Sequence, residues 1–210
     1  MHMDESDKIK RRYNRYSYLY DLFESLPEKL FFAKYRKEII PKLRGKVLEI
    51  GVGTGKNLPY YSGATEVTAV DFSDKMLNKA KEKLKRLNKN NIKFQLADVQ
   101  NLPFSDNSFD FVVATFVFCS VPDPIKGFSE VKRVLKDSGQ AIFLEHVKSK
   151  NKLRGKLQEI SNPLTVGLFG FNINRETQKN IVRGGLNITQ DKHLAMDDII
   201  RVFECKKTNL

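Results

Sequence analysis

The chain contains the stretch VLEIGVGTGKN, in which an apolar run from Val47 leads into three glycines at alternate positions. Glycine loses more conformational freedom on folding than any other residue, so three glycines so close together need a structural reason. A strand that ends in glycine-rich sequence and turns toward a helix is typical of the carboxyl edge of a parallel sheet, where ligands bind close to the backbone. The stretch therefore predicts a ligand site at a strand end.

Short apolar runs alternate with helix-like patterns along the rest of the chain. After the first run, strands are expected at residues 66–71, 91–98, 109–116 and 140–147, and the last two at 186–195 and 198–207. Helices are expected at residues 73–87 and 124–135, where apolar residues recur on one face. This alternation predicts an α/β fold with a mostly parallel, doubly wound, seven-stranded sheet whose C-terminal strand is antiparallel.

Two segments lie outside this alternation. Residues 1–45 predict a helical N-terminal cap, because one helical stripe interleaved with Lys and Arg carries Ile9, Tyr13, Tyr16 and Tyr20. Residues 148–185 predict a substrate-side insertion in a domain of residues 46–210. The insertion opens with five basic residues and then offers an apolar wall, LTVGLFGF.

The net charge is +12, which favours anionic partners or serves solubility alone. The basic N-terminus and Lys148–Lys156 are candidates for docking on an anionic lipid surface. No apolar stretch approaches the roughly 20 residues of a membrane span. With no signal-peptide core and two distant cysteines, a reduced cytoplasmic protein, peripheral to a membrane at most, is expected.

The spacing of the glycines excludes a dinucleotide fingerprint, because Lys56 stands where the third glycine of that pattern belongs. Asp71 and Asp98 end the second and third expected strands, where their carboxylates can accept from ribose hydroxyls and an exocyclic amine. Together with the glycines they predict a pocket for an adenosine-like ligand. The alternative is that both acids cap the following helices. Glu49 either holds the loop or faces a cationic ligand.

Residues 47 to about 147 resemble a class I S-adenosylmethionine-dependent methyltransferase of the small-molecule group that includes quinone-biosynthesis enzymes. The ordered motifs that carry the resemblance are VLEIGVGTG, VTAVDFSDKML, ADVQNLPFSDNSFDFVVATFVF and EVKRVLKDSGQ. The resemblance implies a Rossmann-like fold, S-adenosyl-L-methionine as cofactor and no metal.

Through this resemblance, Asp71 is expected to bind the ribose hydroxyls and Asp98 the adenine amine. The other residues that it places at the cofactor are Tyr20, Glu49, Gly51, Gly53, Gly55, Phe72, Met76, Val99 and Thr115. Phe116 and Cys119 would lie near the methyl group and the substrate opening. For Tyr20, core packing with its stripe partners is an equal alternative.

The later stretches FVFCSVPDP, FLEHV and GFNINRET are similar to bacterial phosphatidylethanolamine N-methyltransferases and to methyltransferase-like thiol methyltransferases. An ammonium or thiol acceptor must lose a proton, and His146, at the end of the fifth expected strand, is the candidate base. Asn174 and Arg175 are candidates for polar contacts to a phosphate or carboxylate of the acceptor. Structural roles for these three residues are the alternatives. A lipid amine is the preferred acceptor; a small thiol, a quinone or a phenol stays open.

Two rival functions are disfavoured by the same residues. Enzymes that methylate flipped bases often carry an Asn/Asp-Pro-Pro-aromatic motif after the fourth strand, whereas this chain reads TFVFCSVPDP there. A non-catalytic binding protein is expected to lose the glycine loop or the acids, and this chain keeps all of them.

Overall fold

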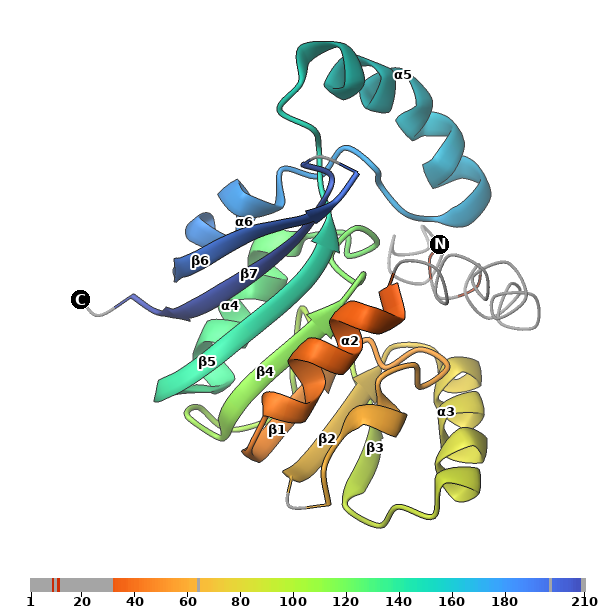
Figure 1. The fold of residues 1–210 in the computed structure, drawn as a ribbon, viewed down its shortest axis with the longest axis vertical. Helices are drawn as coiled ribbons and strands as arrows, with labels where there is room; N and C mark the ends of the chain where they lie inside the picture. Colours follow the sequence, from red (N-terminus) through yellow and green to blue (C-terminus); the bar gives the residue numbers. More distant parts are fainter. Residues whose placement is uncertain (1–8, 10, 12–31, 64, 197, 209–210) are drawn as a thin grey trace, which may run out of the picture.

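The computed structural model describes residues 9, 11, 32–63, 65–196 and 198–208 (Figure 1). Seven strands of this part of the chain form one sheet, and they are β1 (Gly45–Ile50), β2 (Thr65–Asp71), β3 (Ile92–Leu96), β4 (Phe109–Thr115), β5 (Leu135–His146), β6 (Leu186–Ala195) and β7 (Ile200–Lys207). The strand order is β3-β2-β1-β4-β5-β7-β6. The predicted seven-stranded Rossmann-like sheet is therefore confirmed.

The strands from β3 to β5 pair in parallel, and β7 is antiparallel to both of its neighbours. A short turn suffices to join β6 to β7, because antiparallel strands need no crossover helix. The chain runs outward from β1 to β3 and then returns to β4 on the other side of β1. Such a reversal opens a crevice at the carboxyl ends of the strands, where ligands of this fold bind.

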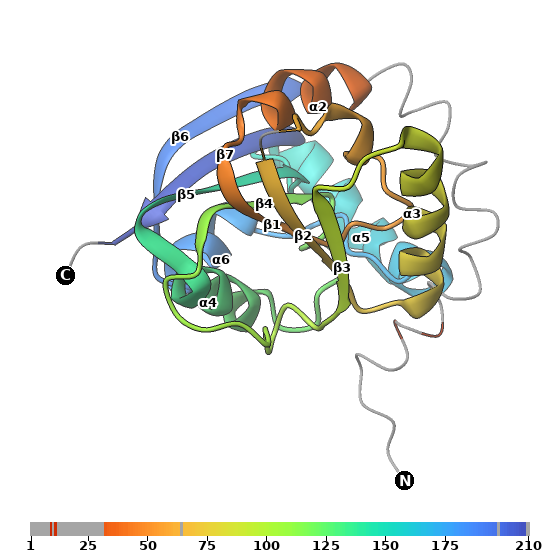
Figure 2. The same ribbon diagram turned by 90° about the horizontal axis from the view of Figure 1, so that it is seen from below.

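Helices cover both faces of the sheet (Figure 2). One face carries α2 (Ala33–Ile39), α3 (Asp74–Leu87) and the short 3-10 helices η2 (Ile40–Lys42) and η3 (Leu58–Tyr60), and the other carries α4 (Pro124–Val134) and α6 (Thr177–Arg183). The long helix α5 (Lys152–Phe169) stands beyond the carboxyl end of β5, away from both faces (Figure 1).

The centre of the sheet is apolar on both sides. On β4, Val112 and Ala114 pack into the core under α4, while Val113 between them packs into the core under α2. A strand that is covered on both faces needs apolar residues at successive positions, which explains the continuous apolar run of β4.

The two acids that end the strand-like runs do not cap helices, so that alternative is wrong. Ser73 caps α3, because its hydroxyl accepts from the amide of Met76 at 3.2 Å. After Asp98 the chain turns back in a single bridge with Asn101 rather than entering a helix. Both carboxylates are therefore available for another purpose.

The secondary structure differs from the expected elements at two places. β5 begins at Leu135 instead of residue 140, because Leu135 pairs with Phe109 before a register shift. Residues 148–185, expected as one insertion, contain the two helices α5 and α6. Of the predicted N-terminal stripe, only Ile9 belongs to the described residues; Tyr13, Tyr16 and Tyr20 lie outside them.

Candidate active site

A hollow with about 430 Å³ of empty space lies at the carboxyl ends of β1, β2 and β3. Its lining includes the predicted cofactor residues Gly51, Asp71, Phe72, Asp98 and Val99. Although these residues are scattered along the sequence, the parallel strands bring them to one edge of the sheet.

The glycines of the first loop serve different purposes. Gly51 has φ +65°, and a Cβ there would lie 2.5 Å from the Val117 side chain, so packing of the protein itself requires this glycine. Gly53 has φ +55°, and a Cβ there would have no atom nearer than 4.0 Å. Gly53 is thus the position where the backbone is left open to a ligand. Gly55 instead lets η3 and α3 approach the loop closely.

Asp71 lies at the end of β2, buried at 5% exposure beside the hollow. Its Oδ2 accepts from the amide of Gly53 at 2.8 Å, and its Oδ1 accepts from the amide of Ser73 at 2.9 Å. Burial raises the pKa of Asp71 to about 6, although these amides partly offset the effect. Since each carboxylate oxygen has a second lone pair, Asp71 can hold the loop and still accept from two hydroxyls.

Asp98 and its neighbours form the far side of the hollow. The Asp98 carboxylate accepts from the backbone amide of Gln100 at 2.8 Å and from its side-chain amide at 2.9 and 3.1 Å. Phe72 and Val99 line the hollow beside it. Met76 is buried in the first turn of α3 and is not part of the lining.

A buried polar cluster lies under the glycine loop, on the α2 side of the sheet. Arg36 donates to the Asn57 side-chain oxygen at 2.7 Å and to the Thr115 hydroxyl at 2.6 Å. Glu49 accepts from the Asn57 amide at 2.8 Å and from the Tyr61 hydroxyl at 2.9 Å. Burial raises the pKa of Glu49 to about 7, against the opposing effects of Asn57, Tyr61 and Arg36.

In the cluster, the Glu49 carboxylate accepts from two protein groups that follow the glycine loop, which agrees with the expectation that it holds the loop. Thr115 likewise directs its hydroxyl into the cluster rather than into the hollow. Sequence reasoning missed Arg36, Asn57 and Tyr61. Asn57 directly follows the glycine loop and is a detectable signal, whereas Arg36 lies among many other basic residues and is not.

The chain leaves β4 through a strained residue. Phe116 has φ +59°, a conformation that is costly for an aromatic residue and is usually found at functional sites. Its ring lies 4.6 Å from that of Phe32 and 6.3 Å from that of His146, between centroids. Arg36 lies over the same ring at 5.7 Å. Cys119 is buried, with its Sγ 3.7 Å from the Phe116 carbonyl oxygen.

Glu145 holds the same loop from the other side. Its Oε1 accepts from the amides of Val117 at 2.9 Å and Phe118 at 3.1 Å, while its Oε2 has no hydrogen-bond partner within the described residues. Burial raises the pKa of Glu145 to about 7. As expected for adjacent strand residues, Glu145 and His146 contact different groups and do not share a site.

Replacing Glu145 with glutamine is expected to make the stability of the cofactor-free protein less dependent on pH. A folded pKa above the ordinary value means that the folded state binds the proton more tightly, so stability is lost as pH rises through the folded pKa of about 7. For Glu145 the loss from pH 5 to pH 8 is about 2–3 kcal/mol. Urea unfolding at both pH values measures it. An equal loss in the wild type and the variant would contradict the assignment.

His146 lies at the end of β5 with Nε2 3.0 Å from the carbonyl oxygen of Asn172. A carbonyl only accepts, so Nε2 carries the hydrogen and Nδ1 is the basic nitrogen of the neutral ring. The ring also meets Phe171 edge-on at 5.7 Å. Asn172 is itself fixed, because its backbone amide donates to the Cys119 carbonyl at 2.8 Å. The arrangement can position a neutral histidine as a proton acceptor.

Arg175 and Asn174, the residues of the insertion that were expected to contact the acceptor, differ in their surroundings. Arg175 donates to the carbonyl of Val121 at 2.7 Å and so ties the insertion to the loop after β4. It also lines a second hollow of about 530 Å³, together with Lys148, Lys150 and Arg201. Asn174 is half-buried. Tyr20, the predicted cap of the cofactor, lies outside the described residues.

Comparison with known proteins agrees with this geometry. A family described as "Methyltransferase domain" matches residues 48–143. A phosphatidylethanolamine N-methyltransferase of Cereibacter sphaeroides is 37% identical over 145 residues, which are 68% of this chain and 70% of the relative. The chain belongs to the class I S-adenosylmethionine-dependent methyltransferases. It is an enzyme, and its cofactor is S-adenosyl-L-methionine.

Other relatives place this methyltransferase among enzymes with different acceptors. A demethylmenaquinone methyltransferase of Staphylococcus haemolyticus is 36% identical over 136 residues, which are 63% of this chain and 56% of the relative. The fold matches a crystal structure of an S-adenosylmethionine-dependent methyltransferase, possible histamine N-methyltransferase, from Thermotoga maritima. The TM-score is 0.70 at 21% identity, over 94% of this chain and 99% of that one.

The residues around the hollow suit the cofactor. The buried carboxylate of Asp71, which holds the amide of Gly53, offers an acceptor for hydroxyl groups, and Phe72 and Val99 offer apolar surface in the same hollow. No helix in the described part of the chain is long and apolar enough to cross a membrane.

Proposed function

We propose that this methyltransferase acts on the amine of a phosphatidylethanolamine-type lipid. The observation that carries the proposal is a row of rings at the ends of β4 and β5, which we call the aromatic row: Phe116, His146, Phe171 and Phe169. Successive ring centroids are 6.3, 5.7 and 5.8 Å apart. The row runs from the half-buried Phe116 to Phe169, which is half exposed.

An ammonium group that gains methyl groups is a cation with an apolar surface, and aromatic rings attract such cations. The exposed end of the row also offers apolar contact to acyl chains. The relative from Cereibacter sphaeroides supports the same acceptor class, since its name states that it acts on phosphatidylethanolamine.

Bound S-adenosyl-L-methionine supplies an electrophilic methyl group together with its leaving group. The residues of the chain then have to orient the amine, exclude water and free its lone pair. Nδ1 of His146 is proposed to accept the proton of the ammonium, because the hydrogen on Nε2 is directed to Asn172. Asp71 and Asp98 are proposed to hold the ribose and the adenine amine.

A methyl-transfer assay with labelled cofactor tests the proposal. Phosphatidylethanolamine vesicles, small thiols and a demethylated quinone in its reduced, hydroquinone form are offered in parallel, with phosphatidylcholine vesicles as the control that lacks an N–H. Label in a methylated phosphatidylethanolamine is expected. Label only in thiols, or only in the quinone, would overturn the lipid assignment while leaving the methyltransferase family intact.

Methylation of a quinone precursor is the second candidate. The demethylmenaquinone methyltransferase relatives favour it, and a flat ring can stack within the aromatic row. His146 would then deprotonate a phenolic hydroxyl.

We also propose that residues 1–45 form an N-terminal cap on the catalytic domain, with Ile9 at the hollow and α2 on one face of the sheet. Residues 46–210 would be the catalytic domain. The enzyme would work in the cytoplasm at a membrane surface.

A further inference from the structure

Helix α5 turns its apolar face toward the solvent, whereas an ordinary surface helix turns its apolar face toward the core. Five large apolar side chains recur at the spacing of one helical face, and all of them are between 48% and 70% exposed: Leu153, Leu157, Ile160, Leu164 and Leu168. We call this face the apolar stripe. A surface helix of a globular protein normally turns such a face toward the core. The stripe therefore faces outward for a reason other than folding of the chain.

The inward side of α5 is polar and is held by specific hydrogen bonds. The Gln158 side-chain amide donates to the carbonyls of Val147 at 3.1 Å and Ile173 at 2.8 Å, and its oxygen accepts from Ser149 at 2.7 Å. Asn162 accepts from the amide of Ile173 at 2.9 Å. These bonds fix the rotation of the helix about its axis, so the outward direction of the stripe is built into the fold.

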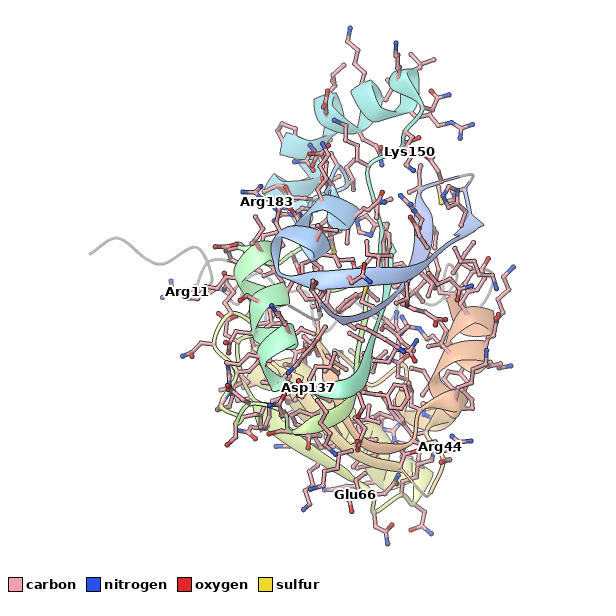
Figure 3. All side chains as sticks on the ribbon, turned by 90° about the vertical axis from the view of Figure 1, so that its left-hand side faces the viewer. Arg11, Arg44, Glu66, Asp137, Lys150 and Arg183 are labelled. Carbon is pink, nitrogen blue, oxygen red and sulfur yellow. The ribbon has the colours of Figure 1, made fainter. Side chains whose placement is uncertain are left out.

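Basic residues flank the stripe where α5 begins. Lys150, Lys152, Arg154 and Lys156 precede or belong to its first turns, while Lys148 pairs with Glu159, the single acidic residue of the helix. Figure 3 shows α5 at one end of the molecule with Lys150 near its start, opposite the end that carries Arg44 and Glu66. Apolar and cationic side chains thus share the end that lies beyond the carboxyl edge of the sheet.

The stripe is continuous with the candidate active site. The last helical residue, Phe169, is 50% exposed and stacks on Phe171 with ring centroids 5.8 Å apart. Phe171 in turn contacts His146. A partner that covers the apolar stripe would therefore also contact Phe169, the exposed end of the aromatic row.

We propose that α5 is a docking helix that lies in the interface of an anionic bilayer, with its apolar stripe among the acyl chains and its basic residues at the lipid phosphates. Helices with this distribution of charge and apolar residues bind at such interfaces. A second copy of the chain would cover the apolar stripe but, with the two helices parallel, would bring the like charges of the helix starts together, whereas anionic lipid neutralises them. The proposal deepens the proposed function by naming the surface from which the lipid acceptor would come.

Vesicle flotation without cofactor tests docking independently of methyl transfer. The wild type is expected to float with vesicles of phosphatidylcholine and phosphatidylglycerol, and to bind phosphatidylcholine alone more weakly. In the variant Leu157→Ser/Ile160→Ser, the partition coefficient is expected to fall by at least about tenfold. The matched control is Leu96→Ser, which replaces an apolar residue of similar exposure on β3, and its binding should equal that of the wild type.

Two outcomes overturn the docking proposal: wild-type protein that fails to float, or a double variant that floats as well as the wild type. A wild-type dimer that becomes a monomer in the double variant, by light scattering, would assign the stripe to a second copy instead. Methylation of a monomeric short-chain phosphatidylethanolamine separates the two proposals. Its absence in all proteins refutes the lipid acceptor, whereas a double variant that methylates it normally but fails on vesicles supports docking.

Discussion

Replacing Asp71 with asparagine is expected to weaken cofactor binding by about 100-fold or more. Hydrogen bonds to a charged acceptor contribute about 1.5–3 kcal/mol each, and this carboxylate is placed to receive two ribose hydroxyls. The asparagine keeps the shape of the side chain and one oxygen that can accept from the loop. Isothermal titration with S-adenosyl-L-homocysteine measures the effect.

The pH dependence of cofactor affinity tests the role of Asp71 in a second way. Because burial raises the pKa of Asp71 to about 6, the cofactor-free carboxylate becomes protonated as pH falls below that value and can no longer accept from two donors. Affinity of the wild type should therefore fall from pH 7 to pH 5, while that of Asp71→Asn stays flat. Glu66→Gln, at the exposed end of the same strand, is the control. An affinity of Asp71→Asn within about threefold of the wild type would exclude a direct role for this carboxylate.

Replacing His146 with asparagine is expected to lower kcat by about 100-fold or more, which is the usual contribution of a positioned general base. Asparagine keeps an N–H that can donate toward Asn172 but has no basic nitrogen. The affinity for cofactor should not change, since His146 does not line the cofactor hollow. Steady-state kinetics with the acceptor identified by the labelling assay measures the effect.

A purely structural role for His146 makes a different prediction. It would lower kcat through misplacement of Asn172 without removing the acidic limb of the pH–rate profile. The limb should disappear in His146→Asn if the ring is the base. His193→Asn is the matched control, because His193 is an exposed histidine on β6. Retention of the limb in His146→Asn would refute the assignment.

Much of the site was predictable because the fold places it by rule. Parallel strands bring their carboxyl ends to one edge, so Gly51, Asp71 and Asp98 meet at one hollow although they are far apart in sequence. Each carried a local signal: a glycine loop, or an acid at the end of an apolar run. The loop, however, has a second function that the pattern did not reveal, since Gly51 and Gly55 are required by packing.

The cluster of Arg36, Glu49, Asn57, Tyr61 and Thr115 was not predictable. Its members come from a helix, two strands and the two ends of η3, and each bond depends on the distance between side chains that only packing sets. Two further features could not be predicted for the same reason: the Oε2 of Glu145, which has no hydrogen-bond partner among the described residues, and the left-handed backbone of Phe116. No local pattern specifies them, because they arise where separate elements meet.

The sequence by itself determined the alternation of strands and helices, the doubly wound sheet and the cofactor edge, because periodicity and strand-end residues are local properties of the chain. Only the tertiary structure decided which way α5 faces. The sequence shows which of its residues are apolar, but the hydrogen bonds of Gln158 and Asn162 fix the direction in which the apolar stripe faces. Those bonds join the helix to residues before and after it, and their geometry exists only once the chain has folded.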